Sequence, residues 1–187
     1  MRKLGFPDRW INLILDCISS VSFSFVINGR VSGRICPSRG LRQGCPLSPY
    51  LFILCAEGFS SLISAAELHG KVLGFRCCRG SPLISHLFFA DDSIVFCKAN
   101  SQSCAVLKDI IRVYSKGSGQ IINFQKSAIT FNPNVSNDCR FHIQALLGLD
   151  NSQAHDCYLG LPSLVGRNRR KTFVSITEKV RKRVSGW

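Results

Sequence analysis

Two apolar segments with a pair of acidic residues between them constrain the fold of this sequence more than any other part. Residues 83–97 place β-branched and aromatic residues on both sides of a small polar centre, residues 90–93. This pattern predicts two buried strands that are joined by a turn. The turn would present Asp91 and Asp92 side by side at the end of a hairpin.

Two interpretations of these adjacent carboxylates are open. Carboxylates beside an apolar core are costly unless a partner compensates for their charge. Mg²⁺ is such a partner, because it usually binds one or two carboxylates together with substrate phosphates. Two such ions can hold the attacking and leaving oxygens of a phosphoryl displacement. The alternative is a structural β-turn, in which Asp91 and Asp92 only accept hydrogen bonds from backbone amides.

The N-terminal part predicts a helix followed by a β-ribbon. The helix opens at Pro7, and its apolar residues recur at intervals of three and four: Trp10, Leu13, Ile14, Cys17 and Ile18. Alternation of apolar and polar residues predicts strands at 21–27 and 30–36. Asn28-Gly29 between them is a hairpin signal, because a type I′ turn needs positive φ at both positions.

A loop rich in Gly and Pro, residues 37–49, follows the ribbon. Glycine allows the backbone to approach a ligand closely, so Arg42 and Gln43 in this loop are candidates for contact with a nucleotide or a template strand. A loop without a binding role is the alternative. Ser48-Pro49 then begins a helix, within which residues 51–56 are apolar on all sides and are expected to be deeply buried.

The remaining elements are predicted from periodicity and turn residues. Gly70 ends the helix that begins at Ser48, and a further helix has the stripe Cys104, Leu107, Ile110, Ile111 and Tyr114. Another helix is predicted over residues 136–147. Short strands are predicted at 72–77 and 128–131, and an extended piece at 158–162.

From Arg167 onward the chain becomes strongly basic and keeps a helical apolar repeat at Phe173, Ile176, Val180 and Val184. This pattern predicts an amphipathic helix with a cationic face. The face is open to three interpretations: a solvated surface, a helix on a membrane surface, or a contact with the backbone of a nucleic-acid duplex. The net charge of +13 favours a polyanionic partner, with nucleic acid before membrane.

Several segments together resemble the motifs of reverse transcriptases, and they occur in the order of that family. Phe88-Phe89-Ala90-Asp91-Asp92 is similar to the aromatic-x-Asp-Asp signature, in the form found in non-LTR (LINE-type) retrotransposons. Residues 39–52 resemble the motif that precedes the long helix of the palm. Residues 119–127, with Asn123, Lys126 and Ser127, resemble the next motif. Residues 158–162 are similar to a segment that follows the palm in plant LINE-like polymerases.

The resemblance implies an α+β fold: a partial polymerase palm, with an antiparallel sheet that carries the Asp-Asp hairpin and is backed by helices. Residues 1–135 would form the palm, and residues 136–187 the palm-to-thumb connection with a C-terminal basic helix.

The family's chemistry is template-directed transfer of a deoxynucleoside triphosphate to a primer 3′-hydroxyl. The resemblance implies an RNA template, a DNA primer and Mg²⁺ (or Mn²⁺) as partners, and no membrane. It implies Asp91 and Asp92 as metal ligands and Lys126 as the residue that faces the triphosphate. The implied template or nucleotide surface comprises Arg42, Gln43, Gly44, Pro46 and Ala90, and the implied contacts with the nucleic-acid backbone are Arg169, Arg170, Lys171, Lys179 and Lys182.

One catalytic element of the family has no counterpart in residues 1–187. These polymerases use a further Asp on a strand upstream of the first helix, and neither Asp8 nor Asp16 suits that place, because both lie in or beside a predicted helix. The resemblance therefore predicts that this chain alone is catalytically incompetent. Two other hypotheses follow from the same gap: a non-catalytic nucleic-acid-binding remnant, and an unstable fragment with an unpaired sheet edge.

The ten cysteines include no Cys-x-x-Cys pair, and several lie in apolar patterns, so we expect reduced thiols in an intracellular protein. No signal peptide is recognisable at the N-terminus, and we expect no transmembrane segment, because the longest evident apolar run is residues 51–56. If the biology of the parent element applies, the location would be nuclear.

Overall fold

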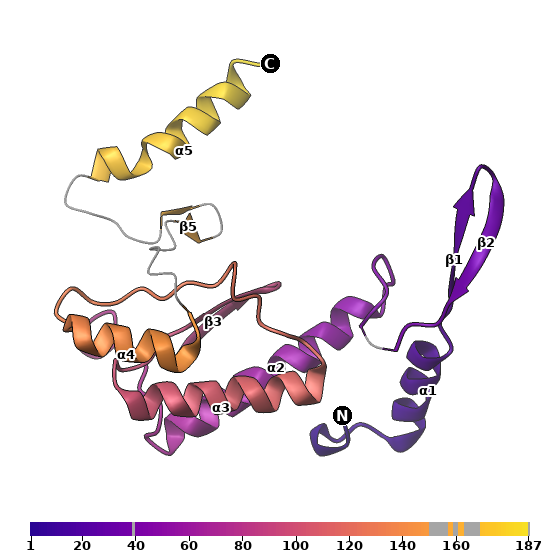
Figure 1. Ribbon diagram of the computed structural model, residues 1–187, viewed down its shortest axis with the longest axis horizontal. Coiled ribbons are helices and arrows are strands. Elements are labelled where there is room, and N and C mark those ends of the chain that lie inside the picture. Colours follow the sequence, from indigo (N-terminus) through magenta and orange to yellow (C-terminus); the bar gives the residue numbers. More distant parts are fainter. Residues whose placement is uncertain (39, 150–156, 159–160, 163–168, 187) are drawn as a thin grey trace. The chain divides into compact units, whose positions relative to one another are not determined.

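The structure is a computed structural model that describes residues 1–187 except 39, 150–156, 159–160, 163–168 and 187 (Figure 1). It contains two compact units. The first comprises Met1–Phe96 and Asp109–Ile121, and the second comprises Cys97–Lys108 and Ile122–Trp187. The described elements are helices and two-stranded antiparallel sheets, as expected for the α+β class.

The N-terminal helices and the β-ribbon form as the sequence predicts. A short 3₁₀ turn, Arg2–Leu4, precedes α1 (Asp8–Ser19), and Pro7 caps α1 at its N-terminus. Strands β1 (Phe23–Ile27) and β2 (Arg30–Ile35) pair through Ile27 and Arg30. Asn28 and Gly29 both have positive φ, 49° and 77°, which confirms the predicted turn.

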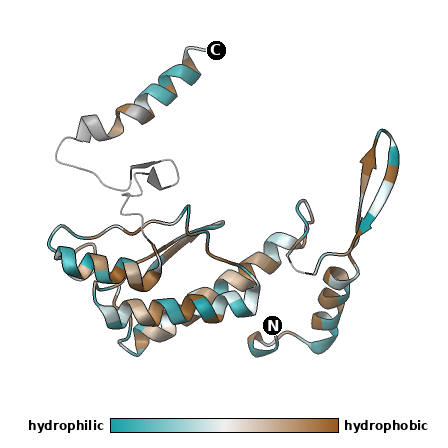
Figure 2. Ribbon diagram, in the orientation of Figure 1, coloured by the Kyte–Doolittle hydropathy of each residue, from teal (hydrophilic) through white to brown (hydrophobic). Residues whose placement is uncertain are grey.

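The residues that are buried in this region differ from those of the predicted apolar stripe. Only Ile11 and Ile14 of α1 are buried, while Trp10, Leu13 and Ile18 of the predicted stripe are exposed. Every residue of β1 and β2 is exposed, although Figure 2 shows apolar residues along most of β1.

Helix α2 (Ser48–Leu68) provides the main packing face of the first unit. Phe59, Ile63 and Ala66 are buried, and Pro49 lies in its first turn as predicted. Gly70, at φ 66°, donates its N–H to the Glu67 carbonyl just after the helix. The expectation that residues 51–56 are deeply buried is wrong: they are half-buried at most, and Ile53 is 62% exposed. The buried positions lie toward the C-terminal half, where α2 meets β3.

The same helix corrects the expectation that no segment approaches a membrane span. Among the residues that the structure describes, α2 is long and apolar enough to cross a membrane by length and composition. Its polar residues interrupt the continuous apolar run, but they are too few to bring its mean hydropathy below that of a possible membrane span. Ile63, which is fully buried, and the hydrogen bonds of Ser60 and Glu67 to residues before and in β3 are typical of a core helix.

Two predicted strands are absent from the described structure, and the other elements are present. Residues 72–77 form only an isolated bridge between Phe75 and Ile84, and residues 128–131 form no strand. The elements that complete the described chain are β3 (His86–Phe89), β4 (Asp92–Val95), α3 (Ser101–Ser118), α4 (Asn137–Leu147), β5 (Cys157–Tyr158), β6 (Leu161–Pro162) and α5 (Arg169–Val184).

The predicted helices of the second half occupy their expected positions. Cys104, Leu107 and Ile110 of α3 are buried, as the stripe predicts. Ser136 caps α4, because its hydroxyl accepts the N–H of Cys139. Strands β5 and β6 lie in the predicted extended piece. The nine cysteines whose state is described are free thiols.

Candidate active site

The Asp-Asp hairpin has the shortest common loop that an antiparallel pair allows. Phe89 of β3 pairs with Asp92 of β4, so only Ala90 and Asp91 form the loop. Ala90 has a positive φ of 49°, which a two-residue turn of this kind requires. Asp92 begins the second strand rather than belonging to the turn. The Asp91 carboxylate therefore lies in the loop, whereas Asp92 belongs to a strand and is paired with Phe89.

Only one face of the hairpin is covered. His86 and Phe88 are half-buried, whereas Leu87 and Phe89 are 45% and 61% exposed. Phe88 stacks in parallel on Phe59 of α2, with ring centroids 5.2 Å apart. The prediction of two buried strands is therefore wrong for the second face, because α2 packs against the residues of one side of the strand alone.

Asp91 and Asp92 are exposed, and no ion pair engages either of them in the described part of the chain. Their oxygens suit a hard divalent cation. No group of three or more His, Cys, Asp or Glu side chains gathers around a possible metal position among the described residues.

The loop before α2 is held by its own hydrogen bonds. The Cys45 N–H donates to the Arg42 carbonyl at 3.4 Å, and the Ser48 hydroxyl donates to the same oxygen at 2.8 Å. Gly44 has a φ of 74°, which favours glycine at this bend. The predicted residues Arg42, Gln43, Gly44 and Pro46 are all exposed, so their polar groups are open to a ligand.

The Cys45 thiol has a lowered pKa. Its largest cause is a hydrogen bond from the Leu47 backbone, and Arg42 adds an attractive charge. No hydrogen bond among the described residues joins this loop to the Asp-Asp hairpin. The position of the loop residues relative to Asp91 and Asp92 therefore stays a prediction.

Lys126 lies in a turn that Asn123 organises. The Asn123 side-chain oxygen accepts the N–H groups of Gln125 and Lys126 at 3.1 and 3.2 Å, and its backbone carbonyl accepts the Ser127 hydroxyl at 2.8 Å. These bonds account for Asn123 and Ser127 of the motif, since both use their side chains. Lys126 itself is exposed and belongs to the second compact unit, whereas the carboxylates belong to the first.

The family model of reverse transcriptase (RNA-dependent DNA polymerase) matches residues 1–163. This match covers most of the chain. The chain belongs to the reverse transcriptase family.

Two curated relatives are similar to parts of this chain. An uncharacterised mitochondrial protein of Arabidopsis thaliana is 56% identical over 69 residues, which are 37% of this chain and 57% of the relative. A retrovirus-related Pol polyprotein from the type-1 retrotransposable element R2 of Popillia japonica is 30% identical over 95 residues, which are 51% of this chain and 15% of the polyprotein. The reverse transcriptase chain thus spans little more than half of one relative and a small part of the other.

The basic helix of the chain is α5. Lys179 and Lys182 are exposed on it. Arg169, Arg170 and Lys171 lie in the helix, and their side chains fall outside the described residues. Val180 and Val184 of the predicted apolar stripe are 57% and 69% exposed, whereas Ile176 is half-buried.

Sequence reasoning missed a hydrogen-bond network between α2 and β3. Ser60 Oγ lies 2.8 Å from His86 Nε2, His86 Nδ1 lies 3.1 Å from Ser85 Oγ, and Ser85 Oγ lies 2.8 Å from Glu67 Oε2. We call Ser60, His86, Ser85 and Glu67 the α2–β3 network. Ser60 and Glu67 are seven residues apart, which places them on one face of the helix, but this spacing does not identify their partners in the next segment.

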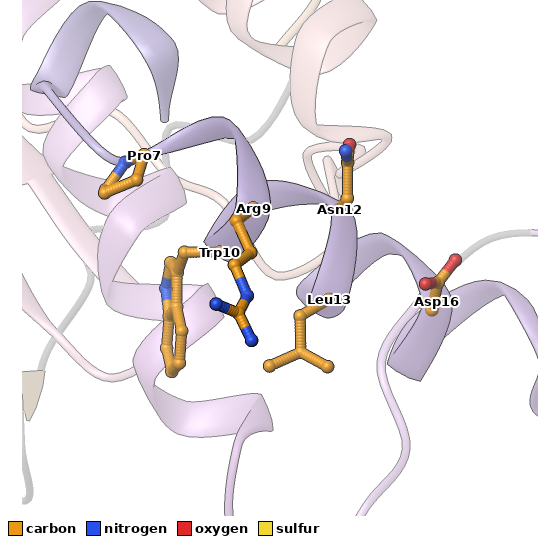
Figure 3. A pocket seen from close by; sticks show the side chains of 6 residues that line it. All are labelled: Pro7, Arg9, Trp10, Asn12, Leu13 and Asp16. Atoms are coloured by element: carbon orange, nitrogen blue, oxygen red, sulfur yellow. The ribbon is translucent and has the colours of Figure 1, made fainter.

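Sequence reasoning also missed a hollow on α1. Figure 3 shows the side chains that line it, which come from Pro7 and successive turns of the helix. They are Pro7, Arg9, Trp10, Asn12, Leu13 and Asp16. None of them is a predicted site residue. Trp10 and Leu13 belong to the predicted apolar stripe, and both line this hollow and are exposed.

Proposed function

We propose that this chain supplies part of the catalytic centre of an RNA-directed DNA polymerase, which joins deoxynucleotides to a primer 3′-hydroxyl on an RNA template. The observation that carries the proposal is the two-residue loop that presents Asp91 beside Asp92 without an ion-pair partner among the described residues. The family match over residues 1–163 supports it. Residues 1–135 would act as the palm and residues 136–187 as the connection to the thumb.

Asp91 is the principal metal ligand in this proposal, and Asp92 lies adjacent. Bound Mg²⁺ or Mn²⁺ would supply positive charge that stabilises the transferring phosphate. Ala90 would lie near the primer end, since it forms the loop together with Asp91. Two carboxylates are few for two mutually repelling cations, so we expect weak binding and little or no polymerisation by this chain alone.

The other predicted residues would hold the substrates. Gln43, Gly44 and Pro46, with Arg42, would contact the template or the incoming nucleotide through the exposed loop before α2. Lys126, on the turn that Asn123 organises, would offer its ammonium group to the triphosphate. There it would stabilise negative charge on the leaving pyrophosphate or donate a proton to it.

The test measures Mn²⁺ binding and primer extension with the purified chain. We expect weak Mn²⁺ binding that Asp91→Asn reduces further, no effect of Asp109→Asn on α3, and no extension of a primer on an RNA template. Binding that does not depend on Asp91 would contradict the metal site. Mg²⁺-dependent extension that Asp91→Asn abolishes would contradict the expected incompetence.

A second function is favoured by the charge of the chain. The net charge is +13, and α5 carries exposed Lys179 and Lys182 beside further basic residues. A non-catalytic nucleic-acid-binding protein would use this surface without the carboxylates. Two results would favour this second function: RNA binding that weakens as the salt concentration rises, and Mn²⁺ binding that is equal in the wild type and Asp91→Asn.

A further inference from the structure

We propose that His86 is a positioning residue for the Asp91–Asp92 loop, and that it acts through its hydrogen bond to Ser60. The inference rests on the proposed function, because it gives the α2–β3 network a role in cation binding. His86 touches neither carboxylate. It lies three residues before Phe89, which is about 10 Å along an extended strand.

The Ser85 hydroxyl proton sets the direction of two hydrogen bonds in the network. Ser85 has a single hydroxyl proton and donates it to Glu67 Oε2 at 2.8 Å. The Ser85 oxygen therefore accepts from His86 Nδ1 at 3.1 Å, so Nδ1 carries a hydrogen. Nε2 forms a hydrogen bond with the Ser60 hydroxyl, 2.8 Å away. The imidazole thus links the middle of α2, at Ser60, to its last turn, at Glu67.

The network is placed where it controls the base of the hairpin. His86 is the first residue of β3 and pairs with Val95, and Ser85 just before it accepts the N–H of Phe96 at 2.8 Å. Ser85 is 4% exposed, so these bonds are shielded from water. The hydrogen bonds that hold Ser85 and His86 to α2 therefore fix the start of β3 and the end of β4, the two strands that the carboxylate loop joins.

The covering of the hairpin makes this attachment important. Phe88 stacks on Phe59, and the His86 ring lies 4.8 Å from the Phe88 ring, so one face is held by aromatic contacts as well. The opposite face carries exposed Leu87 and Phe89, which no described residue covers. Aromatic stacking alone permits sliding along α2, whereas a hydrogen bond to one serine fixes the register.

The experiment compares four variants in the whole chain: His86→Ala, His86→Gln, Ser60→Ala and Ser61→Ala. Gln can replace the imidazole nitrogen as a partner of Ser60, and Ser61 is the neighbouring exposed serine, so Ser61→Ala is the matched control. The first measurement is Mn²⁺ affinity at a temperature at which every variant is folded. The second is amide hydrogen exchange of residues 89–92, with residues 25–32 as the internal reference.

We expect His86→Ala and Ser60→Ala to weaken Mn²⁺ binding roughly three- to tenfold, which is what the loss of one hydrogen bond gives. His86→Gln should restore most of the affinity, and Ser61→Ala should not change it. A merely stabilising role would lower the melting temperature and leave the affinity of the folded protein unchanged. Wild-type affinity in His86→Ala, or a His86→Gln variant as weak as His86→Ala, would overturn the proposal.

Failure of the metal site itself is recognised separately. If the wild type and Asp91→Asn bind Mn²⁺ equally, the proposed function fails, and hydrogen exchange alone decides on positioning. Faster exchange in His86→Ala at residues 89–92 but not at 25–32 would support the positioning role. An equal change in the exchange rate at residues 89–92 and at residues 25–32 would overturn it.

Discussion

Gly74 lies directly against the backbone of Ile84. A methyl group at Gly74 would meet the Ile84 carbonyl carbon at 2.5 Å and the Ser85 nitrogen at 2.8 Å. The approach is imposed by the next residue, since Phe75 and Ile84 exchange two backbone hydrogen bonds of 2.9 Å. This contact locates the segment that enters the Asp-Asp hairpin and the α2–β3 network.

Gly74→Ala should therefore lower the free energy of unfolding by roughly 1–3 kcal/mol, because backbone atoms cannot yield as a flexible side chain would. Gly58→Ala in α2 is the matched control, since nothing lies within 4 Å of a methyl group there. Alanine is the better helix former, so the control should gain up to about 1 kcal/mol. Urea denaturation of both variants checks this, and equal stability of the two would contradict the packing.

Ala90 supplies a second prediction, because its φ of 49° is unfavourable for a residue with a side chain. Ala90→Gly should raise the free energy of unfolding by roughly 0.5–1 kcal/mol, after the greater freedom of glycine in the unfolded chain is subtracted. Asn28→Gly is the control: Asn28 has the same φ, but asparagine tolerates it better. Thermal denaturation should show the larger gain at position 90, and a loss there would refute the assigned turn.

The sequence predicts those features that local chemistry determines. Asn28-Gly29 defines one hairpin, Ser136 caps α4, and the apolar stripe of α3 is buried where expected. The carboxylate pair is recognisable for the same reason, since its strands and loop are contiguous.

Features that depend on distant partners could not be read in this way. Ile53 is exposed although its neighbours are all apolar, because burial requires a covering element and α2 meets β3 farther along. Residues 72–77 have a strand-like composition but pair only through Phe75. The bond between Ser60 and His86 joins residues 26 positions apart, and no local pattern encodes it.

The Cys45 thiol gives a prediction about pH. A hydrogen bond from the Leu47 backbone stabilises its thiolate, and the charge of Arg42 adds to this, so its pKa is lowered. A lowered pKa means that the thiolate persists to lower pH, and the alkylation rate with iodoacetamide should reach half its maximum below the pH seen for a free cysteine derivative. Arg42→Gln should move this midpoint upward, because it removes the attractive charge. A midpoint at or above that of the free derivative would contradict the geometry of the loop.

The exposed lysines of α5 give a prediction about salt. If Lys179 and Lys182 contact nucleic-acid phosphates, each contact releases counterions, and the affinity falls as salt rises. Lys179→Gln and Lys182→Gln should each reduce the slope of log affinity against log salt by about one, with similar losses for unrelated sequences. Lys116→Gln, an exposed lysine on α3, is the control and should leave the slope unchanged. Fluorescence anisotropy with an RNA–DNA duplex at several salt concentrations measures all three, and an equal decrease for Lys116→Gln would mean that overall charge, rather than α5, binds the duplex.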